Sequence, residues 1–135
     1  MHEAGAILID VSALGPDVRF DRRILEGFGH PVMLCHGPSQ GVCPLLADEG
    51  CELIEEAHGV IFELDLDQPA HREILAKYQE LLDEDIPIRV LVKPGQELRY
   101  PQLLEGVDQV WTQPPTASDL DAFSAGIEAY DRTVE

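Results

Sequence analysis

Short apolar runs alternate with amphipathic segments along this chain, and the alternation predicts its secondary structure. The apolar runs are bounded by turn residues and predict five buried strands: Ala6–Val11, Pro31–Cys35, Gly59–Leu64, Ile86–Val92 and Val107–Thr112. The segments between them predict helices that follow Gly15-Pro16, lie within Pro44–Ala57, span Ala70–Leu82, lie near Tyr100–Leu104 and run from Ser118 to about Tyr130.

The helical spacing also predicts which side chains face the core. In the first helix the predicted inner face is Val18, Phe20, Ile24, Leu25 and Phe28, with Gly29 as the stop. In the third helix the predicted apolar positions are Ile74, Leu75, Tyr78, Leu81 and Leu82. Ser118 with Asp121 three residues later predicts a capping box at the start of the last helix.

Strands that alternate with helices predict an α/β fold with a parallel sheet covered by helices on both faces. For five strands at this size we expect the doubly wound, flavodoxin-like order 2-1-3-4-5 in a three-layer α/β/α sandwich. The chain of 135 residues is long enough for one such domain, so we expect a single domain over residues 1–135.

The charge balance restricts the partners. Nine Lys and Arg against 26 Asp and Glu give a formal net charge of −17. A surface this negative repels phosphate backbones and anionic membranes, so we expect neither nucleic acid nor membrane as a partner. It favours a protein partner with a basic surface, and a homodimer stays open. The N-terminus lacks the features of a signal peptide and no apolar run could span a bilayer, so we expect a cytoplasmic protein.

In an open α/β sheet, ligands bind beyond the carboxyl ends of the strands. The predicted strand ends bring polar side chains to that edge, and we take them as site candidates: Asp10, Glu63, Asp65, Asp67, Lys93 and Gln113. Neither a Walker sequence nor a dinucleotide-binding glycine fingerprint is present. The sequence thus indicates a strand-end site without assigning a reaction to it.

Three segments resemble the receiver domain of two-component response regulators. ILIDV resembles the first strand with its acidic pair, and HGVIFELDLDQP the central strand that carries the phosphoryl-accepting aspartate. GVDQVWTQPPTASDLDAFSAGIEAY resembles the last strand, the Lys-Pro turn and the final helix. The resemblance implies a receiver-like fold over nearly the whole chain and a role in signal transduction.

The chain departs from the receiver pattern at the positions that would carry chemistry. Asp10 fits one of the two Mg²⁺-binding acids, and Val11 occupies the other. Glu63 aligns with the acceptor, although a shift of two residues offers Asp65. Val92-Lys93-Pro94 stands where a hydroxyl is expected, and Gln113 where the lysine is expected. The resemblance therefore implies a degenerate, pseudo-receiver-like regulatory module without phosphotransfer, rather than an enzyme.

The cysteines give an alternative function. Cys35, His36, Cys43 and Cys51 lie in one segment whose first residues follow a predicted strand. Thiolates and imidazole could bind Zn²⁺ or an iron–sulfur cluster, which would make the protein a metal or redox sensor. A reversible disulfide between Cys35 and Cys43 and simple burial of apolar thiols stay open, because the spacing lacks a compact CxxC.

Overall fold

The computed structural model describes residues 6–10, 16–35, 57–82 and 86–133. The strands are β1 (Ala6–Asp10), β2 (Val32–Cys35), β3 (Ala57–Phe62), β4 (Ile88–Leu91) and β5 (Gln109–Trp111). The helices are α1 (Pro16–Gly27), α3 (Pro69–Leu81), α4 (Gln96–Arg99), α5 (Pro101–Leu104) and α6 (Ala117–Thr133). All five predicted strands are present: β3 begins and ends two residues earlier than predicted, and the other four are shorter than predicted by one to three residues.

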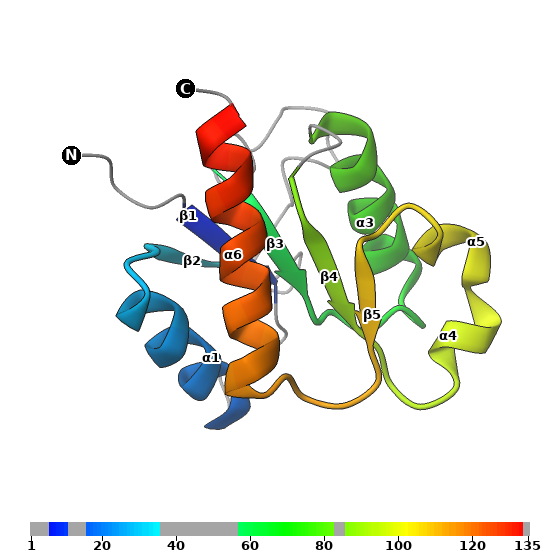
Figure 1. Ribbon diagram of the computed structural model, residues 1–135. Coiled ribbons are helices and arrows are strands. Elements are labelled where there is room, and N and C mark those ends of the chain that lie inside the picture. The colour runs from blue at the N-terminus through cyan, green and yellow to red at the C-terminus, as the bar shows by residue number, and fades with distance from the viewer. Residues whose placement is uncertain (1–5, 11–15, 36–56, 83–85, 134–135) are drawn as a thin grey trace.

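The strands form one parallel sheet in the order β2-β1-β3-β4-β5, which confirms the predicted order. Side chains along a strand point alternately to the two faces of the sheet. In β1, Ile7 and Ile9 join the core on the side of α1 and α6, whereas Leu8 joins the core on the side of α3 and α5. This alternation produces two apolar layers around the sheet, and Figure 1 shows α6 lying across one face of it.

The helix α6 approaches the sheet closely at Gly59 in β3. A Cβ atom at Gly59 would lie 2.6 Å from Cδ1 of Ile127 and 2.8 Å from Cζ of Phe123. The buried side chains of His30 and Ser124 also meet on this face, with 2.6 Å between Nε2 of His30 and Oγ of Ser124. The absence of a side chain at Gly59 therefore sets how near α6 packs.

The inner face of α1 differs from the prediction. Val18 and Leu25 are buried as predicted, but Phe20 and Phe28 are 40% and 41% exposed, and Asp21 is buried instead. Val18, Asp21 and Leu25 are spaced three and seven residues apart, which places them on one helical face, whereas Phe20 lies on another. Phe20 and Phe28 were wrongly predicted to face the core because they are apolar, although their positions on the helix point elsewhere.

Three other details of the helices also differ. Ala57, the last residue of the range within which the second helix was predicted, is the first residue of β3, and the rest of that range lies outside the described residues. Leu81 ends α3 with its side chain 57% exposed. The capping box of α6 is formed by Thr116 and Asp119: Asp119 donates its N–H to Oγ1 of Thr116, and Thr116 donates its N–H to Oδ2 of Asp119.

No helix among the described residues has the length and apolar character needed to cross a bilayer. The sheet directs the carboxyl ends of all five strands to one edge, and the candidate site is built there.

Candidate functional site at the carboxyl edge of the sheet

The register of the sheet aligns the strand ends. Asp10, the last residue of β1, pairs with Cys35 of β2 on one side and with Phe62 of β3 on the other. The loop after β3 and the loop after β4 extend from the same edge, because β3 and β4 pair in parallel from Val60 opposite Ile88 onward. The predicted strand-end residues are thus brought to one side of the molecule.

The loop between β3 and α3 is folded around Asp65. Its Oδ1 accepts the backbone N–H of Asp67 at 3.0 Å, and its carbonyl oxygen accepts the N–H of Gln68 at 3.1 Å. Nδ1 of His71, in the first turns of α3, lies 2.8 Å from the same carbonyl oxygen. A carboxylate that accepts a backbone N–H two residues later closes a local turn, which fixes the orientation of Asp65.

Asp65 also connects this loop to the segment after β4. The ammonium of Lys93 lies 3.0 Å from Oδ2 of Asp65, and Gln96 donates from Nε2 to Oδ1 of Asp65 at 2.7 Å. Oε1 of Gln96 in turn accepts the backbone N–H of Lys93 at 3.0 Å. Gln96 is buried, and its amide group forms hydrogen bonds to both loops, to Asp65 in one and to Lys93 in the other.

These contacts lower the pKa of Asp65 from 3.8 to about 2. The N–H of Asp67 contributes most, and the hydrogen bond from Lys93 comes next. Donors aimed at a carboxylate stabilise its charged form, so Asp65 stays ionised at any physiological pH.

Asp67 forms a second set of contacts beside the first. Arg99 donates from Nη2 to Oδ2 of Asp67 at 3.0 Å, and the hydroxyl of Tyr100 donates to Oδ1 at 2.8 Å. The hydrogen bond to Asp67 raises the pKa of the Tyr100 hydroxyl. Arg72 of α3 donates to the carbonyl oxygen of Leu66 at 2.8 Å, and its guanidinium lies 5.0 Å from the centre of the Tyr100 ring. Both carboxylates are thus held by groups of the same chain.

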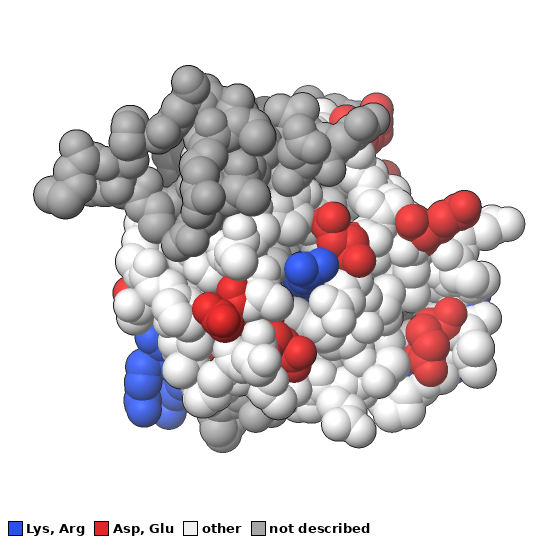
Figure 2. Space-filling model, viewed as in Figure 1, with Lys and Arg blue, Asp and Glu red and all other residues white. Residues whose placement is uncertain are grey.

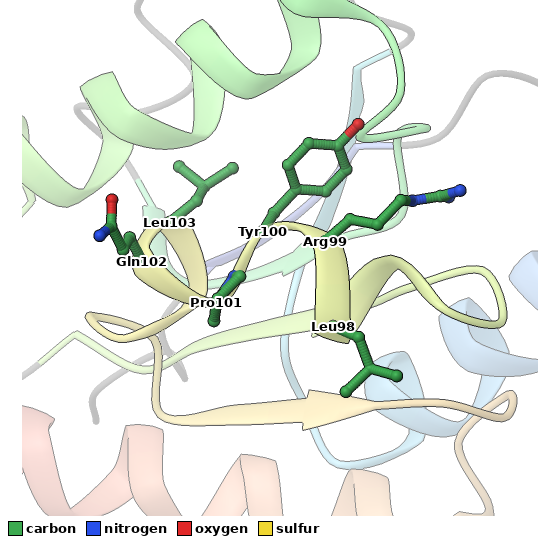
Figure 3. A pocket seen from close by; sticks show the side chains of 6 residues that line it. All are labelled: Leu98, Arg99, Tyr100, Pro101, Gln102 and Leu103. Carbon is green, nitrogen blue, oxygen red and sulfur yellow. The ribbon is translucent and has the colours of Figure 1, made fainter.

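The outer side of α4 and α5 has a surface cavity of about 460 Å³ lined by residues 98–103. Figure 3 shows Leu98 pointing away from Tyr100 and Arg99 in this segment. The side chain of Leu98 is 80% exposed. The residues that hold Asp67 therefore also form part of an open, mixed polar and apolar surface.

We compared the chain with family models, curated sequences and solved structures. No protein-family model and no curated protein sequence matches the chain. Matches among the solved structures include a response regulator receiver domain from Clostridium thermocellum, with a TM-score of 0.68, 16% identity, and 97% of this chain and 99% of that chain covered. A CheY-like receiver domain from Methanospirillum hungatei JF-1 matches with a TM-score of 0.65 and 18% identity over 96% and 98% of the two chains.

The fold is that of a receiver domain. A phosphorylated cyanobacterial phytochrome response regulator, RcpA, has the same fold with a TM-score of 0.59 and 21% identity over 98% and 97% of the two chains. At such identities the likeness concerns the fold alone, so the residues at the receiver positions have to be compared one by one.

The positions that the receiver resemblance singles out are occupied as follows. Glu63 is half-buried directly after β3, Val92 is buried directly after β4, and Gln113 is exposed two residues after β5. Asp10 ends β1, and Val11 lies outside the described residues. Of the six predicted site residues, the structure brings Asp65 and Lys93 into direct contact and places Asp67 in the adjoining set of contacts.

Sequence reasoning missed the residues that hold these acids: His71, Arg72, Gln96, Arg99 and Tyr100. They come from the first turns of α3 and from the segment after β4, and only the turn residues of Pro94-Gly95 in the sequence hinted at a compact loop there. Gly95 has a φ of 90°, a left-handed conformation that favours glycine.

The predicted metal site lies mostly outside the described residues. Cys35 is described: its side chain is half-buried and packs against the core on the α3 side. His36, Cys43 and Cys51 belong to the segment that is not described. Within the described ranges no three His, Cys, Asp or Glu side chains gather in a way that could hold an ion. Binding of Zn²⁺ or an iron–sulfur cluster by these four residues therefore stays a prediction.

Proposed function

We propose that this chain is a non-enzymatic regulatory module of the receiver fold that lacks phosphotransfer and acts in the cytoplasm through protein contacts. The observation that carries the proposal is the ion pair between Lys93 and Asp65. Phosphoryl transfer relies on cations and hydrogen-bond donors that are free to stabilise the transferred group. Here Lys93 is engaged by the chain's own carboxylate.

The other strand ends support the same conclusion. Val92 offers no hydroxyl where the receiver pattern expects one, and Gln113 offers no charge where the pattern expects a lysine. Arg99, a further cation near this edge, is engaged by Asp67. In place of a reactive centre, the edge carries hydrogen bonds that join the loop after β3 to α4.

A module without chemistry has to act by binding. The net charge of −17 makes most of the surface of this molecule suited to a partner with a basic surface. A homodimer is a second form of protein contact. The joined loops after β3 and β4 hold α4 and α5 in one arrangement, so the module presents a fixed surface rather than one switched by phosphorylation.

Intact mass after incubation with acetyl phosphate and Mg²⁺ tests the proposal. We expect an unchanged mass for the wild-type protein under conditions in which an active receiver domain gains one phosphoryl group. A stoichiometric gain would contradict the proposal. The matched variants Asp65→Asn and Glu63→Gln would then show which carboxylate accepts the phosphoryl group, because the gain would disappear in only one of them.

A further inference from the structure

The basic residues of this acidic chain are distributed unevenly. Three of the nine Lys and Arg residues, Arg19, Arg22 and Arg23, lie within five residues of α1, and all three are exposed. Figure 2 shows basic side chains over α1, whereas acidic side chains are scattered over the rest of the visible face. The outer side of α1 therefore reverses the sign of the charge that dominates the molecule.

Arg19 and Arg23 also differ from the other described cations in their surroundings. Lys93 and Arg99 are paired with carboxylates, Arg72 donates to a backbone carbonyl, and Arg22 lies 3.4 Å from Glu26. The guanidinium of Arg89 lies 5.7 Å from the centre of the Phe123 ring, and Lys77 also has a partner. Among the described residues, Arg19 and Arg23 have no carboxylate within ion-pair distance. They are four residues apart on one helical face, where like charges repel each other. An anionic group bound between them would remove this repulsion.

An apolar ridge runs beside the two arginines. Phe20, Ile24 and Phe28 are spaced four residues apart, and the N–H of Phe28 still bonds to the carbonyl of Ile24, so Phe28 continues the same turn. Phe20 and Phe28 are 40% and 41% exposed, and Ile24 is half-buried. Gly27 lies four residues after Arg23 and so continues the row of the arginines, where it leaves open space, since a Cβ atom there would meet nothing within 4 Å.

We infer that this α1 face, formed by Arg19, Arg23, Phe20, Ile24 and Phe28, binds an acidic amphipathic protein segment that presents carboxylates beside apolar side chains. Such a segment would lay its apolar row against the phenylalanines and its carboxylates against the arginines. Arginine and aromatic side chains together are the composition enriched at the centres of protein interfaces. The inference rests on the proposed function as a binding module and specifies one surface and one partner class for it.

The net charge of the chain favours a short acidic segment over larger acidic partners. Nucleic acid, an anionic membrane and a second copy of this chain each carry many negative charges, and the charge of −17 repels all of them at long range. A short acidic segment carries few charges, and within a screening length of about 8 Å at physiological salt the nearby arginines dominate.

The test uses the full chain and a fluorescent synthetic peptide in which glutamates at i and i+4 run beside leucines at i and i+4. We expect saturable binding by fluorescence anisotropy and amide resonance shifts confined to residues 16–28. The variant Arg19→Gln/Arg23→Gln should bind roughly tenfold more weakly or worse, as expected when two interfacial arginines lose their ion pairs. Phe20→Ser should also weaken binding, and folding of each variant is checked by its amide spectrum.

The matched control is Gln102→Glu/Gln109→Glu, which makes the same change in net charge at two exposed positions on α5 and β5. It should bind the peptide nearly as well as the wild type. Equal weakening in the control, no saturable binding, or shifts outside α1 would overturn the inference. So would self-association, vesicle binding or DNA binding that depends on Arg19 and Arg23. None of these outcomes bears on whether the protein accepts a phosphoryl group, so the two proposals fail separately.

Discussion

The carboxylate of Asp65 and the ammonium of Lys93 lie 3.0 Å apart and join the loop after β3 to the loop after β4. In the folded protein the same carboxylate is bonded by the backbone of Asp67 and by the amide of Gln96, so the contact is one part of a larger set. These contacts join the two loops at the carboxyl edge of the sheet.

The stabilising effect of Asp65 should depend on pH in a defined direction. Its pKa falls from 3.8 to about 2 on folding, so its contribution is fully present above pH 3.8 and is lost as the pH falls through about 2. Asp65→Asn should lower the free energy of unfolding by about 1 kcal/mol at pH 7. Urea unfolding from pH 7 to pH 2 should show the difference between wild type and variant shrinking below pH 4. A difference that grows on acidification would contradict the assignment.

Gln96 should contribute more than its polar side chain suggests. It is buried and bonds to both Asp65 and the backbone of Lys93, so Gln96→Ala leaves buried partners unsatisfied. We expect a loss of about 2 kcal/mol in the free energy of unfolding. Gln102→Ala, at an exposed position on α5, is the control and should change stability by less than about 0.5 kcal/mol. Equal effects in the two variants would show that Gln96 does not join the loops.

Sequence reasoning reached part of this site and missed the rest for physical reasons. Asp65 and Lys93 were predictable neighbours, because the ends of parallel strands meet at one edge. The role of Gln96 was not predictable, because it depends on the turn at Gly95 that directs α4 back toward Asp65. The order of the strands followed from the alternation of elements, whereas the exposure of Phe20 follows from packing that the apolar type of a residue does not reveal.

The close approach of α6 to β3 makes Gly59 sensitive to substitution. In Gly59→Ala the new methyl group would press on Ile127 and Phe123, which belong to a packed core. We expect a loss of about 1–3 kcal/mol in the free energy of unfolding, typical of overpacking. Gly27→Ala is the matched control: its methyl group meets open space at the end of α1, so the variant should be as stable as the wild type or more stable by up to about 1 kcal/mol. Thermal or urea unfolding distinguishes the two, and a tolerated alanine at position 59 would contradict the packing.

The N-terminal cap of α6 differs between the structure and the prediction from the sequence. Thr116 and Asp119 bond each other reciprocally, whereas the sequence alone pointed to Ser118 and Asp121. Thr116→Ala should lower the free energy of unfolding by about 1 kcal/mol, and Ser118→Ala should leave it nearly unchanged. The reverse order of the two effects in urea unfolding would move the cap to Ser118.

Centrally, we propose that the carboxyl edge of the sheet does not carry out phosphoryl transfer. Amide spectra recorded while Mg²⁺ and beryllofluoride, a mimic of a carboxylate-bound phosphoryl group, are added report directly on that edge. Because Lys93 and Arg99 are engaged by Asp65 and Asp67, we expect no saturable shifts of the resonances of residues 63–67 or of Lys93. Saturable shifts there that require both Mg²⁺ and beryllofluoride, and that disappear in Asp65→Asn or Glu63→Gln, would contradict the account.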